Sequence, residues 1–292
     1  MLVRTWNLCH GNTVPLGRKA YLREMVELAT ADQPDIVCFQ EVPAWALEKM
    51  GEWTGMTSTS ARARGATVGP VRIPSGVGKA LTSLNHGKLR SAFSGQGNVI
   101  LVPHDARITG EKTITLNTNP FCEEEGKKLG LDEKMMRWWE HERRVCQIAH
   151  VELASGRRLL VANLHATSYP KDVRLPDAEL RRATRFIDRQ SEIDEVVVAA
   201  GDFNITRADS KTIVTLLALP KDDRWSDTGP QIDHVLVRGA ATGSVRVWTD
   251  EERVFDGKLL SDHAPVDVDV LAGRVRTQAS AEVRSPSSDA IG

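Results

Sequence analysis

Short apolar segments that end abruptly in Asn, Asp, Glu or His constrain this chain more than any other feature. The clearest spans 195–204, where EVVVAA runs directly into GDFN, and similar segments occupy 2–8, 35–42 and 158–166. A continuous apolar run of this length is typical of a strand buried on both faces. A polar side chain at the end of such a strand usually reaches the rim of the sheet. The sequence therefore predicts buried strands that carry chemically active groups at their ends.

Helical segments separate these strands. Residues 17–31 and 176–190 are expected to be helices, and 123–142 is typical of a charged helix that contains tryptophan and breaks at Gly130. The further expected strands are 97–102, 144–153, 231–239 and 265–271. A strand followed by a helix and a second strand opens an α/β or layered α+β domain, and that is the predicted fold class.

Three local features allow two interpretations each. Residues 57–104 contain Arg and Lys but no Asp or Glu, and we expect long loops with short strands there. This basic segment either lines a nucleic-acid groove, where it would contact phosphates without reading bases, or forms a solvated surface loop. Trp138 and Trp139 either stack on a base or an apolar substrate, or pack their helix into the core. The polar residues 273–292 lack a core pattern and are expected to form a disordered tail.

Charge and hydropathy exclude some classes of protein. The chain has 38 Lys and Arg against 39 Asp and Glu, so it lacks the basic excess that non-specific coating of DNA requires. No apolar run approaches the ~18 residues needed to cross a bilayer. The first residues lack the pattern of a secretion signal, and none of the four cysteines form a CxxC pair. We expect a soluble cytoplasmic protein with reduced core thiols.

Each polar group at a strand end also has a structural explanation. Glu41 suits the start of a helix, Asn163 and Asn204 suit turns or caps, and His165 suits a buried structural histidine. Asp233 is harder to dismiss, because a carboxylate within a strand needs a partner if it is buried. The acidic and imidazole groups are listed together as Glu41, His165, Asp202, Asp233, Asp262 and His263. Such a set suits Mg²⁺ or Mn²⁺ and the hydrolysis of an anionic ester.

Six motifs in fixed order carry a resemblance to a known family. They are TWNL (5–8), QEV (40–42), NLHAT (163–167), GDFN (201–204), IDHV (232–235) and SDHAPV (261–266). Any one of them is weak evidence, but the ordered series resembles the endonuclease/exonuclease/phosphatase superfamily. The resemblance implies a four-layer αββα sandwich, in which two mixed sheets pack face to face with helices outside. It also implies that residues 1–272 form the catalytic domain.

The resemblance implies roles for individual residues. Glu41 matches the metal-binding glutamate of the family, and Asn7 and Asp262 would help to hold the ion and its waters. The ion would be Mg²⁺ or Mn²⁺. Arg144 lies near the place of a basic or tyrosyl phosphate ligand in the family, and Arg143 matches that place equally well.

The remaining roles concern the phosphoryl group. Asp202 and Asn204 would orient the attacking water and the phosphoryl oxygens, and His165 would contact the scissile phosphate. His263 would donate to a phosphoryl oxygen or transfer a proton. Asp233 would hold His263 in one tautomer, because a carboxylate partner orients an imidazole and makes it more basic.

The motifs also favour one branch of the family. A histidine at the position of His165 resembles the deoxyribonuclease, neutral sphingomyelinase and deadenylase branches rather than the AP endonucleases. The deoxyribonuclease branch pairs this histidine with an acid, and Glu48, Glu52, Asp105 and the 123–142 helix supply candidates.

We expect a monomeric, metal-dependent phosphodiester hydrolase, a nuclease acting on DNA or RNA. The alternative is a phosphatase or phosphodiesterase for a small molecule or lipid head group. Intact motifs argue against a catalytically silent binding module. A serine hydrolase is excluded, because Ser261, Asp262 and His263 are adjacent in sequence and cannot form a nucleophile–base–orienter chain among themselves.

Overall fold

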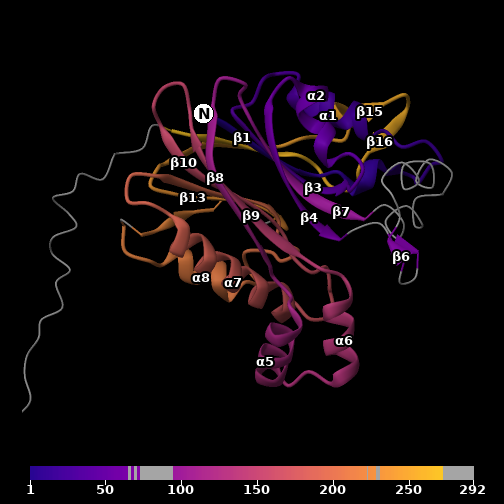
Figure 1. Ribbon diagram of the computed structural model, residues 1–292, viewed down its shortest axis with the longest axis vertical. Coiled ribbons are helices and arrows are strands. Elements are labelled where there is room, and N and C mark those ends of the chain that lie inside the picture. Colours follow the sequence, from indigo (N-terminus) through magenta and orange to yellow (C-terminus); the bar gives the residue numbers. More distant parts are fainter. Residues whose placement is uncertain (65–66, 69–70, 73–94, 222, 228–230, 272–292) are drawn as a thin grey trace, which may run out of the picture.

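Two six-stranded mixed sheets pack face to face, and helices cover their outer faces (Figure 1). The computed structural model describes residues 1–64, 67–68, 71–72, 95–221, 223–227 and 231–271. This α+β arrangement is the expected αββα sandwich, so the predicted fold class is confirmed. None of the helices in the described ranges is long and apolar enough to cross a membrane.

The first sheet brings the two earliest motifs to one edge. Its strands lie in the order β14 (Thr242–Val247), β17 (Val266–Val270), β1 (Leu2–Asn7), β3 (Ile36–Pro43), β7 (Gln96–Val102) and β4 (Thr57–Arg64). β1 and β3 are parallel, with Asn7 opposite Gln40, so both strands end at the same edge.

The second sheet brings the later motifs to one edge. Its strands lie in the order β12 (Trp225–Ser226), β13 (Asp233–Arg238), β11 (Val196–Asp202), β10 (Arg158–His165), β9 (Val145–Glu152) and β8 (Arg107–Thr115). His165 is opposite Asp202 on the parallel strands β10 and β11, and Asp202 is opposite Asp233 on β13. Three candidate residues therefore share one edge.

Burial on both faces explains why the central strands have almost uninterrupted apolar sequences. On β11, Val196, Val198 and Ala200 face the apolar layer between the sheets. Val197 and Ala199 face outward, toward α7 (Arg174–Gln190) and α8 (Lys211–Leu217). The outer face of the first sheet is covered in the same way by α1 (Leu22–Thr30) and α2 (Met50–Thr54).

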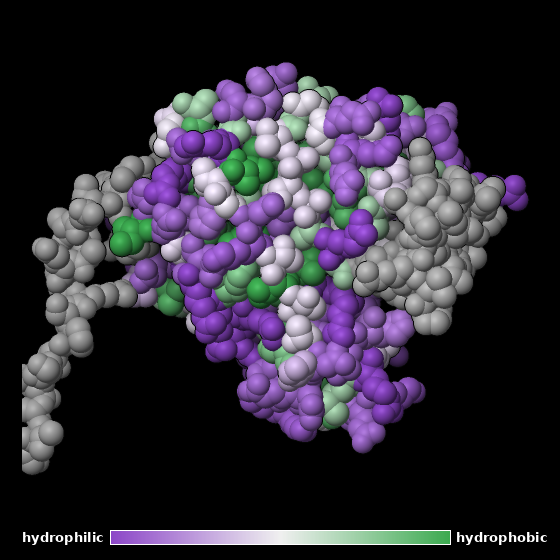
Figure 2. All heavy atoms as spheres, viewed as in Figure 1, coloured by the Kyte–Doolittle hydropathy of each residue, from purple (hydrophilic) through white to green (hydrophobic). Residues whose placement is uncertain are grey.

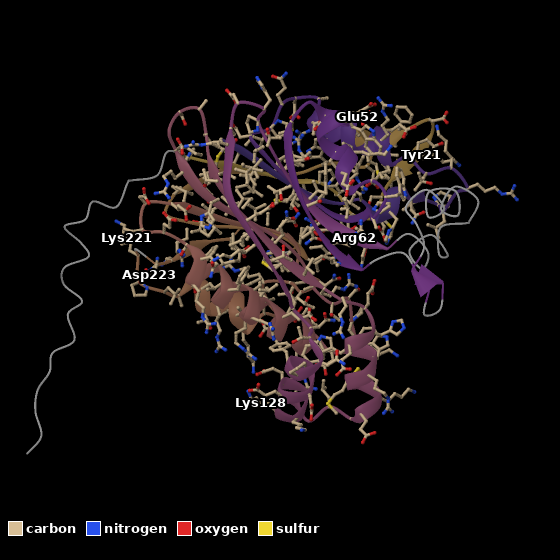
Figure 3. The ribbon with its side chains drawn as sticks, in the orientation of Figure 1. Tyr21, Glu52, Arg62, Lys128, Lys221 and Asp223 are labelled. Atoms are coloured by element: carbon tan, nitrogen blue, oxygen red, sulfur yellow. The ribbon has the colours of Figure 1, made fainter. Side chains whose placement is uncertain are left out.

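Two further helices form a hairpin between β8 and β9 that projects from the sandwich (Figure 1). α5 spans Asn119–Leu129 and α6 spans Glu133–His141. The expected break at Gly130 is confirmed, because this residue ends α5 with a φ of 68°. Lys128 lies at the outer end of the hairpin (Figure 3), and the surface there is predominantly hydrophilic (Figure 2).

The remaining elements are short. They are β2 (Thr13–Val14), β5 (Thr67–Val68), β6 (Val71–Arg72), β15 (Val254–Phe255), β16 (Lys258–Leu260), and the 3₁₀ turns η1 (Cys9–Gly11), η2 (Leu47–Lys49) and η3 (Glu251–Arg253).

Several elements differ from the sequence prediction. The first helix begins at Leu22 rather than residue 17. β8, β14 and α8 were not predicted from the sequence, and β4 forms an eight-residue strand where long loops with short strands were expected. β8 and β14 are edge strands with mostly exposed residues, so they lack the apolar run that marked the central strands.

Two expectations fall on residues outside the described ranges. The expected tail, 273–292, lies wholly outside them, as does much of the basic segment, at 65–66, 69–70 and 73–94. All four cysteines are free thiols. Cys38, Cys122 and Cys146 are buried as expected, but Cys9 lies beyond the end of β1, in η1, and is only partly buried.

Buried amide side chains connect the two sheets directly beneath the shared edge. The Asn163 amide nitrogen, on β10, donates to the carbonyl oxygens of Phe39 and Val99 in the opposite sheet, at 2.9 and 2.8 Å. Its side-chain oxygen accepts from Gln40 Nε2 at 2.8 Å. In the other direction, the side-chain amide of Asn98, on β7, donates to the Asn163 carbonyl oxygen at 3.2 Å. Asn163 and Gln40 thus link the sheets, which is a structural role for both.

Replacing Asn163 should weaken this link. Asn163→Ala removes three side-chain hydrogen bonds and leaves buried partners unsatisfied, so we expect the free energy of unfolding to fall by roughly 3 kcal/mol. Urea denaturation followed by tryptophan fluorescence measures it. Asn119→Ala, at an exposed position in α5, is the control; it removes one exposed hydrogen bond from Arg143 and should change stability by less than about 1 kcal/mol. Equal effects of the two substitutions would contradict the structural role.

Candidate active site

Asp202 stands at the centre of the shared edge. Its Oδ2 accepts a hydrogen bond from Asn7 Nδ2 at 2.9 Å. The same oxygen lies 3.5 Å from His165 Nε2 and 3.8 Å from His263 Nε2. Asp202 is only 1% exposed, and its burial, together with the negative charge of Asp233, raises its pKa to about 7. The carboxyl group is therefore poised to exchange a proton near neutral pH.

His263 is held by Asp233. The Nδ1 of His263 lies 2.8 Å from Asp233 Oδ2, which leaves its Nε2 facing Asp202. Burial opposes protonation of His263, but the hydrogen bond and negative charge of Asp233 outweigh it and raise the pKa to about 10. His263 is thus an imidazolium at neutral pH.

The backbone around His263 is fixed from both sides. Its carbonyl accepts hydrogen bonds from Trp6 Nε1 at 2.8 Å and Arg253 Nη1 at 2.9 Å. The Ser261 hydroxyl accepts from the His263 N–H at 3.1 Å and donates to the Asn7 carbonyl at 2.7 Å. Through these two hydrogen bonds, Ser261 links the loop that carries His263 to β1.

A bulge in β3 aims Glu41 at the site. The pairing with β7 slips by one residue between Phe39 and Val42, and Glu41 adopts a φ of 53°. Such a bulge re-aims a side chain that regular alternation would send elsewhere. One Glu41 oxygen lies 3.7 Å from His165 Nε2, and the other lies 3.3 Å from His10 Nε2. Gln40 meanwhile points between the sheets.

The GDFN turn has a backbone that few residues could adopt. Gly201 has a φ of 145°, and a Cβ there would lie 1.9 Å from the Leu164 carbonyl oxygen. Asn204 has a φ of 51°; its N–H donates to Asp202 Oδ1 at 3.0 Å, and its side-chain amide donates to the Ala166 carbonyl at 3.0 Å. Asn204 therefore orients Asp202 from behind.

Arg144, rather than Arg143, reaches the site. Its Nη1 lies 2.8 and 2.9 Å from the two ring nitrogens of His165, and its Nη2 donates to Glu142 Oε2 at 2.8 Å. Arg143 instead contacts Asn117 and Asn119. Burial and the Arg144 charge hold the pKa of His165 well below its ordinary value, so this imidazole is neutral.

His165 has its acidic neighbours within the site itself. Among the described residues, the carboxylates within 4 Å of its ring nitrogens are Glu41 and Asp202. Glu48, Glu52, Asp105 and the acids of 123–142, which the sequence offered as its acidic partner, form no such contact in the described structure.

Cys9 and His10, which the sequence motifs did not single out for the site, also lie here. The Cys9 thiol, whose pKa is raised by burial and by the nearby Glu41 charge, hydrogen-bonds the exposed side chain of Asp262, a residue that the sequence did indicate. His10 is 3% exposed and lies beside Glu41. Their position directly after the TWNL motif was the signal available in the sequence.

The acidic side chains of the site fit a divalent cation. Asp202, Asp233 and His263 each place one potential ligand atom within 4.8 Å of the others, but the imidazolium form of His263 has no nitrogen lone pair to bind a metal, so the carboxylates are the ligands that this site offers. The Oδ1 of Asp233 is buried without a hydrogen-bond partner among the described residues. Oxygen-rich sets of this kind suit Mg²⁺ or Mn²⁺.

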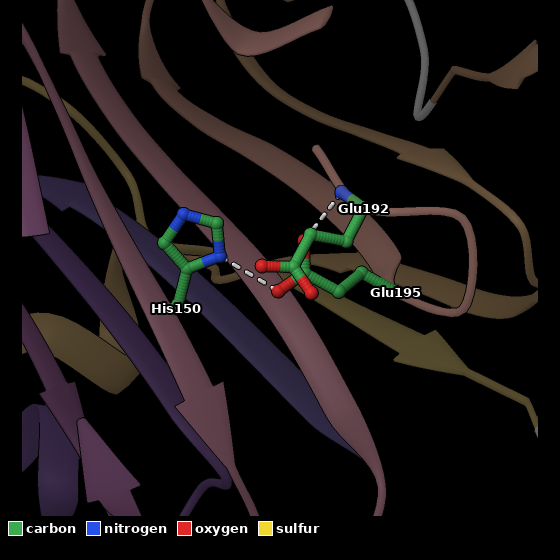
Figure 4. Close-up of side chains that lie close together, drawn as sticks. All are labelled: His150, Glu192 and Glu195. Atoms are coloured by element: carbon green, nitrogen blue, oxygen red, sulfur yellow. Dashed lines mark hydrogen bonds and ion pairs between the residues drawn. The ribbon is translucent and has the colours of Figure 1, made fainter. Parts of the chain in front are cut away.

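Figure 4 shows a second group of potential ligands, His150, Glu192 and Glu195. The strand register places it at the opposite end of the second sheet. Here His150 Nδ1 lies 2.7 Å from Glu195 Oε1, while Glu195 Oε2 accepts the Glu192 N–H at 2.9 Å. Arg158 pairs with Glu192. This group is already charge-compensated, unlike the acidic edge around Asp202.

Comparison with known proteins gives a consistent result. Residues 5–263 match the profile of the Endonuclease/Exonuclease/phosphatase family. No curated protein sequence matches the chain significantly.

Three solved structures illustrate the shared fold. An endonuclease/exonuclease/phosphatase from Beutenbergia cavernae has 17% identity and a TM-score of 0.66, covering 94% of this chain and 72% of that one. Danio rerio TDP2, complexed with a single-strand DNA product, has 15% identity and a TM-score of 0.60 over 93% of this chain and 99% of that one. A Bacteroides thetaiotaomicron mannosyl-6-phosphatase has 14% identity and a TM-score of 0.61, with coverages of 93% and 100%.

The Asp233–His263 pair yields a titration test. Asp233→Asn removes the negative charge that favours the imidazolium, so the His263 pKa should fall from about 10 toward or below its ordinary value near 6.5. The ring should then be neutral at pH 8, where the parent ring is charged. NMR titration of the histidine Cε1–H signals in EDTA measures this. His150, at the other end of the sheet, is the internal control, and an unchanged His263 midpoint would contradict the pairing.

Proposed function

The chain belongs to the endonuclease/exonuclease/phosphatase family, and we propose that it is a divalent-metal-dependent phosphodiester hydrolase, a nuclease acting on DNA or RNA. The observation that carries the proposal is the convergence on Asp202 of Asn7, neutral His165 and the charged His263–Asp233 pair. A proton acceptor and a proton donor therefore stand at one buried edge, which is the equipment for attack by water on a phosphate ester.

We assign the metal to the acidic side of this edge. Glu41 would be the main ligand, and Asn7 and Asp262 would help to hold the ion and its waters. Mg²⁺ or Mn²⁺ bound there would neutralise a non-bridging phosphoryl oxygen and the charge that develops on the leaving oxygen. The bulge that projects Glu41 from β3 supports this assignment, because it presents a carboxylate to the site from an otherwise buried strand.

Proton transfer falls to Asp202 and His263. Asp202 aligns the attacking water and takes its proton, and its raised pKa suits it to that step. His263 donates from Nε2 to a phosphoryl oxygen, because its Nδ1 is held by Asp233. Asp233 is a positioning residue, and so is Asn204, through its N–H bond to Asp202.

Two further groups would face the phosphate. His165, being neutral, can donate one hydrogen bond to a phosphoryl oxygen, and Arg144 adds a positive charge beside it. Donors placed where charge grows stabilise the pentacovalent state more than the ground state. The histidine at this position favours the deoxyribonuclease and neutral sphingomyelinase branches over the AP endonucleases.

The nature of the ester separates the leading proposal from its alternative. TDP2 is known with a single-strand DNA product, whereas the mannosyl-6-phosphatase is named for a small sugar phosphate. The exposed ring of Trp138, which lines a pocket together with Arg144, favours nucleic acid for this chain; a small-molecule or lipid head-group ester is the alternative. We also propose that the protein acts as a cytoplasmic monomer, in keeping with its free thiols.

A substrate panel tests the activity. Supercoiled plasmid, single-stranded DNA, RNA, bis-p-nitrophenyl phosphate, sphingomyelin and inositol phosphates are incubated with Mg²⁺ or Mn²⁺. We expect nucleic-acid cleavage that EDTA abolishes and that His263→Ala and Asp202→Asn each lower by at least about a hundredfold. Asp233→Ala should be milder than His263→Ala, because it leaves the imidazole in place. Parent rates in both catalytic variants would refute the mechanism, and turnover of small esters alone would select the alternative.

Metal binding is tested without turnover. Glu41→Gln removes a negative ligand, so the Kd for Mn²⁺ should rise at least about tenfold. Electron paramagnetic resonance of free Mn²⁺ during titration measures it. Glu192→Gln is a matched control, since it changes the same residue type in the charge-compensated group around His150. Equal loss in both variants would argue against a site at Glu41.

A further inference from the structure

The two adjacent tryptophans of α6 differ sharply in their exposure to solvent. Trp139 is 1% exposed, and its Nε1 donates to the buried carboxylate of Glu179 at 2.6 Å. It also packs edge-to-face with Phe121, at 5.7 Å between ring centroids. Trp138 is 44% exposed although it carries one of the largest apolar side chains. Because Trp139 anchors one face of α6, its neighbour is turned toward solvent.

The exposed ring is held in place rather than free. Trp138 lies 4.4 Å from Tyr169, between ring centroids, with the planes tilted by 48°. Tyr169 packs in turn against the apolar cluster beneath the hairpin. Asn117 fastens the end of α6, donating to the carbonyls of Trp139 and Glu142 at 2.7 Å each. The Trp138–Tyr169 pair is thus a preformed aromatic surface, which lowers the entropic cost of binding a flat ligand.

This aromatic pair adjoins the candidate active site. A pocket of about 70 Å³ is lined by Trp138, Trp139, His141, Glu142, Arg144 and Thr167. Arg144 belongs to both places, because it lines this pocket and contacts His165. Its Nε is buried and has no hydrogen-bond partner among the described residues. A ligand in the pocket would therefore lie one side chain away from the group that faces the scissile phosphate.

The charges of the pocket select the kind of ligand. Arg144 is positive, but the carboxylate of Glu142 bonds to it and remains 49% exposed. A second phosphate would meet this negative charge and the aromatic ring of Trp138, so an anion is disfavoured. A nucleobase is neutral, has a flat face for the ring and has polar edge groups that can donate to the exposed carboxylate of Glu142.

We propose that Trp138 and Tyr169 form a stacking subsite for an unpaired nucleobase next to the scissile phosphate, with Arg144 and Glu142 facing the edge of the base. The inference rests on the proposed nuclease function and narrows its substrate to single-stranded nucleic acid. Stacking on an aromatic side chain is tolerant of sequence, so the subsite selects an unpaired strand rather than a particular base.

The first test compares two substrates of the full-length protein. Trp138→Ala should lower the ratio of kcat/KM for a single-stranded oligonucleotide to that for bis-p-nitrophenyl phosphate by roughly tenfold, since only the oligonucleotide offers a base. Trp138→Phe keeps an aromatic face and should restore most of the ratio. Phe255→Ala is the matched control, because Phe255 is a 45% exposed aromatic on β15, outside the hairpin, and its loss should leave the ratio unchanged.

The second test locates the base and avoids turnover. A fluorescent oligonucleotide is bound in EDTA, and an abasic linker replaces each nucleotide in turn. One position should weaken binding to the parent protein roughly tenfold and should have little further effect on Trp138→Ala, because the stacking partner is already absent.

Three outcomes would overturn the inference. A change of less than twofold in the ratio for Trp138→Ala would show that the ring does not contact substrate. A parallel loss with both substrates would show a merely structural role. Hydrolysis of small esters by the parent protein without cleavage or binding of any oligonucleotide would remove the nuclease proposal as well, whereas the first two outcomes leave it standing.

Discussion

The hydrogen bonds of Asn163 across the two sheets are the constraint on which the site depends. An amide in an apolar interior is costly unless its donors and acceptor are all paired, and here the partners come from β3 and β7 of the opposite sheet. They are satisfied only in one register and at one sheet spacing. Asn163 precedes His165 by two residues on β10, so the same bonds set the height at which that histidine meets Asp202 and Glu41.

The electrostatics of the site follow from this enclosure. Two histidines lie near one carboxylate oxygen of Asp202 and yet differ in protonation, one being neutral and the other positively charged. His165 shares its surroundings with the Arg144 guanidinium and stays neutral, whereas His263 has a dedicated carboxylate and stays charged. Exposure to water would weaken the interactions of the rings with Arg144 and Asp233 and reduce this difference in protonation, whereas burial preserves it. The division of labour between the two rings therefore arises from their partners rather than from their residue type.

Much of this architecture was predictable because the central strands carry distinct signals. Strands buried on both faces have continuous apolar sequences, and their polar ends predicted where Asp202 and His165 would lie. The edge strands β8 and β14 escaped detection, because exposed strands share their composition with loops. Their pairing depends on partners distant in sequence.

Within the site, the sequence could not decide between Arg143 and Arg144 as the phosphate ligand. The two residues differ in their position relative to β9, which begins at Val145, directly after Arg144. His10 and Cys9 were missed for a related reason. Their approach to Glu41 and Asp262 depends on the left-handed backbone of η1, which no local pattern announced.

The position of the α5–α6 hairpin has a consequence for how such a protein can diversify. It joins β9 to β8, the outermost strand of its sheet, and the small apolar cluster that it forms with Leu175 and Ala178 of α7 lies apart from the layer between the sheets. Insertions, deletions or exchange of this hairpin would therefore disturb neither sheet interior. Changes to the hairpin surface can alter which ligand binds while the reacting groups stay the same. Ligand preference and chemistry can therefore evolve separately in this chain.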